Sequence, residues 1–75
     1  KEKFDWKEVV KLQISLAAAR VNARLTQKEV AKKMHISKQT IVNWEKGVTY
    51  PKPAYFEMLC RIYNIDRENI FLPSA

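Results

Sequence analysis

The sequence contains little glycine, cysteine or histidine, and each scarcity excludes a class of protein. One glycine and three prolines in 75 residues, together with long stretches of helical apolar spacing, predict an all-α fold. The single cysteine, Cys60, excludes an intrachain disulfide and favours a reducing cytosol. That thiol and the single histidine, His35, are too few ligands for a zinc site, so no metal or cofactor is expected.

Long apolar runs are also missing. No segment approaches the roughly 20 apolar residues that cross a bilayer, and no secretory signal is expected. A hydrophobic content of 47% still provides a core for one small domain, taken as residues 1–75. Because His35 falls in a predicted turn and Cys60 on a predicted core face, they form no nucleophile–base pair, and no enzyme is expected.

Positive charge is concentrated in the middle of the chain. Residues 20–52 contain eight basic and two acidic residues, so this segment alone accounts for the whole net charge of +6. Basic and acidic residues balance in the rest of the chain. A polyanion that contacts the middle segment is the simplest explanation, although many small domains are basic only for solubility.

Apolar spacing and capping residues predict five helices. Capping boxes at Asp5–Glu8 and Thr26–Glu29 begin the first two helices, and Ser37 caps the third. Gly47 lies where a left-handed residue ends a helix. The predicted helices are Trp6 to Asn22, Gln27 to Met34, Lys38 to Lys46, Pro53 to Tyr63, and a short last helix that Asp66 caps and that ends at Phe71.

The second and third predicted helices form a helix-turn-helix over residues 26–47, with the turn at His35 and Ile36. Ile41 and Trp44 face inward, which leaves a polar and basic outer face on the third helix. A helix-turn-helix lays its second helix in the major groove of DNA. His35 is interpreted as a turn residue near DNA phosphates.

The order of residues around this unit resembles the Cro/CI-type (XRE-like) family of phage and bacterial regulators. The resemblance implies a compact five-helix bundle like that of lambda repressor, here with an extended N-terminal helix. It also implies a sequence-specific DNA-binding regulator in the bacterial cytoplasm, associated with the nucleoid. The matching positions are Arg20, Leu25, Thr26, Gln27, Val30, Ala31, Ile36, Ser37, Ile41, Trp44, Glu45, Gly47, Pro51, Leu59, Ile65, Ile70 and Phe71.

The family resemblance implies base contacts from the outer face of the recognition helix. Lys can donate to guanine, and Gln or Asn can pair with adenine through two hydrogen bonds. Thr and Val can offer methyl groups to thymine. A solvated helix surface, or for Val42 the rim of the core, is the alternative. The expected base-contacting residues are Lys38, Gln39, Thr40, Val42 and Asn43.

The resemblance also implies phosphate contacts on both sides of that helix, which add affinity without sequence information. Gln27 is expected to bind a phosphate and to brace the start of the recognition helix. Arg20 and Glu45 are expected to form a structural ion pair between helices. The expected phosphate-contacting residues are Gln27, Lys28, Lys46, Thr49, Tyr50 and Lys52.

Family members mostly bind palindromic operators as dimers, so double-stranded DNA and a second copy are the expected partners. A dimer patch is predicted at Met58, Ile62, Phe71 and Leu72, while Ile70 is expected to close the monomer core. The alternative is an antitoxin or other protein-interaction module that contacts a protein through the N-terminal extension or the C-terminus.

Arg24 departs from the family, which often has Gly or Asn at this position. Either the backbone there avoids positive φ, or the chain accepts the strain of a non-glycine residue with positive φ.

Overall fold

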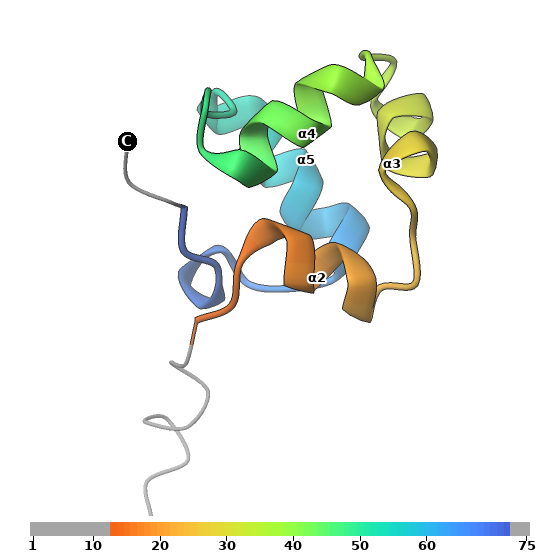
Figure 1. Ribbon diagram of the computed structural model, residues 1–75. Coiled ribbons are helices and arrows are strands. Elements are labelled where there is room, and N and C mark those ends of the chain that lie inside the picture. The colour runs from red at the N-terminus through yellow and green to blue at the C-terminus, as the bar shows by residue number, and fades with distance from the viewer. Residues whose placement is uncertain (1–12, 73–75) are drawn as a thin grey trace, which may run out of the picture.

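The computed structural model describes residues 13–72. Figure 1 shows α4 above α2, with α3 at one side and α5 behind. The regular secondary structure of these residues is helical, apart from one isolated parallel bridge between Ile14 and Ile70. Its elements are α2 (Leu16–Asn22), α3 (Gln27–Met34), α4 (Lys38–Lys46), α5 (Pro53–Tyr63) and the 3-10 turn η1 (Arg67–Asn69).

Hydroxyl side chains fix where the first three helices begin. The Ser15, Thr26 and Ser37 hydroxyls accept hydrogen bonds from backbone N–H groups in the first turns of α2, α3 and α4. At α3 the box is complete, because the Glu29 carboxylate accepts the Thr26 backbone N–H at 2.8 Å. These hydrogen bonds hold the pKa of Glu29 below its usual value. The predicted starts of α3 and α4 are therefore confirmed.

Left-handed residues turn the chain after its helices. Gly47 (φ 79°), His35 (φ 58°) and Asn64 (φ 55°) are the C-caps of α4, α3 and α5. Arg24, in the loop after α2, also has positive φ, at 61°. The chain therefore accepts a strained non-glycine residue at the position where the family often has Gly or Asn.

One core holds the four helices together. Leu16 and Ala19 come from α2, and the small Ala31 allows α3 to approach its neighbours closely. Ile41, Trp44 and Cys60 are buried as predicted, and Ile70 closes the core from the C-terminal segment. The buried core residues are Leu16, Ala19, Val30, Ala31, Met34, Ile41, Trp44, Leu59, Cys60, Tyr63 and Ile70.

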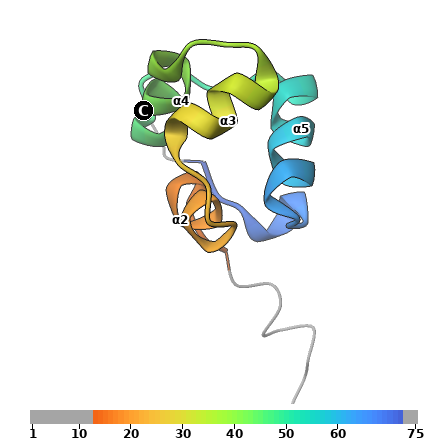
Figure 2. The same ribbon diagram turned by 90° about the vertical axis from the view of Figure 1, so that its right-hand side faces the viewer.

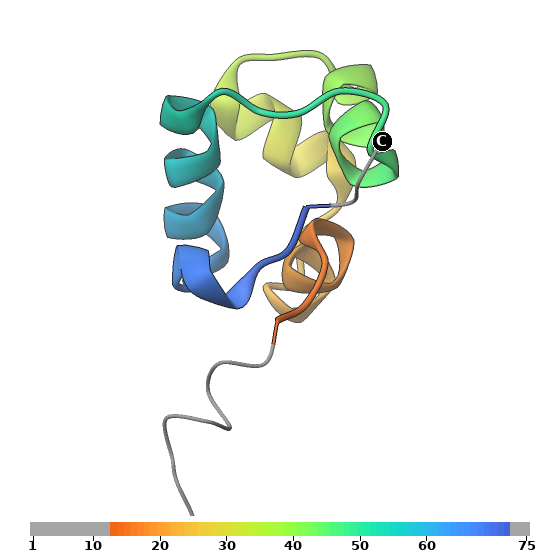
Figure 3. The same cartoon turned by 90° about the vertical axis from the view of Figure 1, so that its left-hand side faces the viewer.

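The prediction of one continuous helix from Trp6 to Asn22 is wrong. Helix α2 begins at Leu16, because Ser15 caps it and Ile14 is held in an extended bridge. The Ile14 N–H donates to the Asn69 carbonyl at 2.8 Å, and its carbonyl accepts the Phe71 N–H at 3.0 Å. Figure 3 shows the two segments side by side. The part of the prediction before residue 13, with the Asp5–Glu8 box, lies outside the described residues.

The last predicted helix is also too long. Only Arg67–Asn69 form a 3-10 turn, and Asp66 makes no side-chain capping hydrogen bond. Ile70 is extended (φ −118°, ψ 132°), since it pairs with the segment before α2. The described residues thus contain four α-helices and one 3-10 turn rather than five α-helices.

Candidate nucleic-acid interface

Helices α3 and α4 form the helix-turn-helix unit. They pack directly on each other, and α4 also contacts α2. The left-handed His35 ends α3, and the Ile36 N–H donates to the Ala31 carbonyl at 3.0 Å. Figure 2 shows α3 in the centre, with α4 at the left and α5 at the right. The sequence-predicted turn at His35 and Ile36 is confirmed.

Helix α4 has one buried and one accessible face. Ile41 and Trp44 lie in the core, so the orientation of the helix about its own axis is fixed. Lys38, Gln39 and Lys46 are exposed. Thr40, Val42 and Asn43 are half-buried at the edges of this outer face. The structure thus gathers the five residues expected to contact bases on the accessible side of α4.

Two hydrogen bonds organise this outer face. The Gln39 Nε2 donates to the Asn43 Oδ1 at 3.0 Å, one helical turn away. The Ser37 and Thr40 hydroxyl oxygens are 2.9 Å apart, within hydrogen-bond distance. This hydrogen bond ties the Thr40 side chain to Ser37, the residue that caps the helix.

A polar cluster behind the unit connects three helices. The Arg20 Nε donates to the Glu45 Oε2 at 2.7 Å, and its Nη2 donates to the Oε1 at 3.3 Å. Another Arg20 nitrogen, Nη1, donates to the Leu25 carbonyl at 3.0 Å. The two charged side chains are only 16% and 8% exposed. The expected ion pair therefore joins α2, the loop after it, and the last turn of α4.

Electrostatics in this cluster favour the charged pair and a neutral tyrosine. The hydrogen bonds that Arg20 donates to the Glu45 carboxylate raise the pKa of Arg20 above its ordinary value. Burial raises the pKa of Tyr63 to about 12, and the nearby Glu45 carboxylate adds to that effect. Tyr63 on α5 thus lies close enough to the Arg20–Glu45 pair to be affected by both charges.

Gln27 has a partner that the sequence did not predict. Its Nε2 donates to the Glu45 Oε1 at 2.9 Å, so the first residue of α3 is tied to the last turn of α4 rather than to its start. One amide N–H remains for another acceptor. Helical spacing could not have found this contact, since the two residues are eighteen positions apart.

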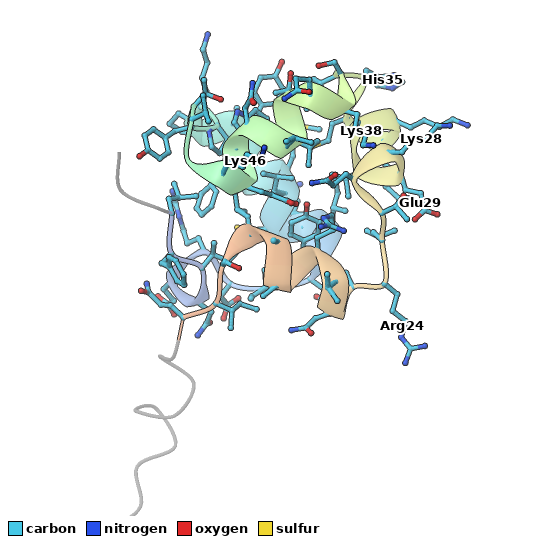
Figure 4. The ribbon with its side chains drawn as sticks, in the orientation of Figure 1. Arg24, Lys28, Glu29, His35, Lys38 and Lys46 are labelled. Carbon is cyan, nitrogen blue, oxygen red and sulfur yellow. The ribbon has the colours of Figure 1, made fainter. Side chains whose placement is uncertain are left out.

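Polar and basic groups surround the accessible face of α4. Figure 4 shows Lys28 on the outer side of α3, His35 at the corner between α3 and α4, and Arg24 pointing away from the α2–α3 loop. The other expected phosphate-contacting residues lie at the end of α4 and in the loop after it. The residues Lys28, Lys46, Thr49, Tyr50 and Lys52 are all exposed.

An aromatic contact supports the loop after α4. The Trp44 and Tyr55 rings lie with centroids 5.8 Å apart, which links the end of α4 to the first turn of α5. Pro51, which belongs to the same loop, is buried. The role of Tyr55 was not predicted, because an aromatic residue two positions after a proline at a helix start is no signal for a specific contact.

The described residues offer little for metal binding, thiol chemistry or membrane insertion. No group of three or more His, Cys, Asp or Glu side chains occurs within residues 13–72. Cys60 is buried as predicted, and burial raises the pKa of its thiol. In the same range, no helix is sufficiently long and apolar to span a bilayer.

The predicted dimer patch is only partly exposed. Met58 and Phe71 are 40% and 44% exposed. Ile62 and Leu72, in contrast, pack against the domain's own core. Because the last segment is extended rather than helical, Leu72 turns back onto the domain while Phe71 remains accessible.

Comparison with known proteins agrees with this geometry. A family model described as Helix-turn-helix matches residues 16–70, which is more than half of the chain. The chain therefore belongs to the Cro/CI-type (XRE) helix-turn-helix family, a family of DNA-binding transcription regulators. Searches of curated proteins and of solved structures found no match. The match ends at Ile70, the residue that closes the core.

Proposed function

We propose that this domain binds double-stranded DNA at specific sequences and acts as a bacterial or phage transcriptional repressor. Helix α4 enters the major groove, and residues on both sides of it contact phosphates. The observation that carries the proposal is the outer face of α4. There Lys38, Gln39 and Asn43 are accessible, while Ile41 and Trp44 hold the opposite face in the core.

Charge supports this assignment. The segment from α2 to the start of α5 carries the net +6 of the chain, and its lysines lie on exposed surface. Lysine ammonium groups bind phosphates and release condensed counterions from DNA. Lys28 on α3 and Lys52 before α5 would hold phosphates on either side of the groove that α4 enters.

We also propose that two copies bind a palindromic operator. A single α4 contacts only a few base pairs. A two-fold dimer doubles the number of base pairs contacted, and its two half-sites lie about 34–36 Å apart. Met58 and Phe71 are the exposed apolar residues of the predicted patch that remain for a second copy.

Selection from a random double-stranded DNA pool at about 150 mM salt tests the proposal. We expect enrichment of one sequence with two-fold symmetry. Enrichment of a short site without symmetry would contradict the proposed dimer and support sequence-specific binding by a single copy. Uniform binding that disappears as salt rises would refute the function, and would favour a protein partner instead.

A further inference from the structure

Two amides on the outer face of α4 are joined before any DNA is present. The Gln39 Nε2 donates to the Asn43 Oδ1 at 3.0 Å. The residues are four positions apart, which places their side chains on neighbouring turns of one helix face. Gln39 is exposed and Asn43 is half-buried, so both can be reached from the groove side of the helix.

The hydrogen bond gives the two amides different free groups. Every primary amide has one carbonyl oxygen and two N–H donors. Asn43 directs its oxygen at Gln39, which leaves its two N–H donors for another partner. Gln39 gives one N–H to Asn43 and keeps its oxygen and the second N–H.

These free groups match different bases. A two-bonded contact with adenine needs the oxygen and an N–H of one amide on the same base edge, facing N6 and N7. Gln39 still has both groups. Asn43 has only donors facing outward, and guanine presents two acceptors, O6 and N7, in the major groove.

We propose that Gln39 and Asn43 contact DNA as one hydrogen-bonded unit, with Gln39 assigned to an adenine and Asn43 to a guanine. The inference rests on the DNA-binding function proposed above and assigns bases to that same site. Asn43 is thereby both a base-contacting residue and the residue that positions the Gln39 amide.

The intrahelical hydrogen bond persists when DNA covers α4. Covering the helix removes water, which strengthens the amide–amide hydrogen bond. Breaking it would leave the Asn43 oxygen without a donor in a buried place. The spacing also fits, because four residues advance about 6 Å along a helix and two base steps advance about 7 Å.

The test measures affinity for the selected operator and for all single-base variants of each half-site. It compares the wild type, Gln39→Ala, Asn43→Ala and the double variant. In the wild type we expect one position that prefers adenine and a position within two steps that prefers guanine, each by about tenfold or more. We expect Asn43→Ala to reduce discrimination at both positions.

Gln39→Ala gives the sharper result. It frees the Asn43 oxygen, so adenine should become acceptable at the position that prefers guanine in the wild type. The double variant should lose less than the product of the two single losses, since the residues act together. Glu57→Ala and Arg61→Ala break a similarly spaced pair on α5, at 3.3 Å, and should leave every base preference unchanged.

Other outcomes overturn the inference. Multiplicative effects of the two substitutions, or adenine preferred at the Asn43 position in the wild type, would show two independent amides while leaving DNA binding intact. If no operator is selected at all, the inference fails together with the proposed function. Circular dichroism of each variant establishes that the loss lies in recognition and not in folding.

Discussion

At the scale of single residues, the Glu45 side chain connects three helices. Its carboxylate accepts hydrogen bonds from Arg20 on α2 and from Gln27 on α3. It belongs to α4, so one side chain fixes where the recognition helix lies relative to the two helices before it. Removing it would leave a largely buried guanidinium without its counter-charge.

We therefore predict that Glu45→Ala lowers the free energy of unfolding by about 3–5 kcal/mol. Urea denaturation followed by circular dichroism measures this loss. Glu57→Ala is the matched control, since it breaks an ion pair that is mostly exposed and should cost about 1 kcal/mol or less. Equal losses in the two variants would contradict a structural role for the Arg20–Glu45 pair.

Tyr63 predicts a dependence of stability on alkaline pH. Its pKa is about 12 in the folded protein and about 10 in the unfolded chain. The unfolded chain therefore loses its proton first. The stability from neutral Tyr63 is complete below pH 10 and is lost as pH rises from 10 toward 12.

The comparison of wild type with Tyr63→Phe isolates this effect from the lysines that titrate in the same range. We expect the difference in unfolding free energy between the two proteins to shift by about 1–2 kcal/mol between pH 9 and pH 11.5. A difference that stays constant with pH would show that the phenol ionises equally well in both states.

Arg24 stores backbone strain, because it holds φ at 61° with a side chain present. Glycine adopts this conformation without the steric cost of a Cβ. We predict that Arg24→Gly is more stable than Arg24→Ala by about 1 kcal/mol, as measured by thermal unfolding. Both variants remove the same charge, so an alanine variant of equal stability would mean that the loop carries no strain.

At the scale of elements, α4 divides into groups that specify bases and groups that add only affinity. Gln39→Ala should cost roughly 1–3 kcal/mol at the base pair that Gln39 contacts. Lys46→Ala should weaken binding to all sequences alike and reduce the salt slope by about 1. Titrations at several salt concentrations, with operator and scrambled DNA, separate the two. If both variants behave alike, this division of α4 is wrong.

Local signals predicted α3, α4 and α5 well. Thr26, Ser37 and Gly47 each combine a capping preference with the start or end of an apolar stripe, so the boundaries follow from neighbouring residues. The break before α2 was missed although Ser15 is itself a capping residue, because residues on both sides of it keep helical spacing. It depends on Ile14 pairing with Ile70, a contact across the whole domain that competes with helical spacing.

The candidate site shows the same difference between features set by neighbouring residues and features set by contacts between helices. The accessible face of α4 follows from the burial of Ile41 and Trp44, which the sequence indicates by spacing. The partners within the site do not. Gln27 was expected at a phosphate and at the start of α4, but its hydrogen bond to Glu45 depends on how α3 crosses α4.

At the scale of the whole molecule, the proposed dimer depends on apolar residues outside the DNA-contacting face. We predict that Phe71→Ser lowers affinity for a palindromic operator and leaves affinity for an isolated half-site unchanged. Val21→Ser is the matched control, because Val21 is an exposed apolar residue on α2. Analytical ultracentrifugation with each DNA gives the stoichiometry. A single copy bound to the palindrome would contradict the two-fold arrangement.

The central claim is that the outer face of α4 distinguishes DNA sequences. The most direct measurement is the ratio of affinities for the selected operator and for a scrambled duplex at about 150 mM salt. We predict a ratio of about 1,000 or more for the wild type. The ratio should fall sharply when Lys38, Gln39 and Asn43 are all replaced by alanine. Equal affinities of the wild type for both duplexes would contradict the claim.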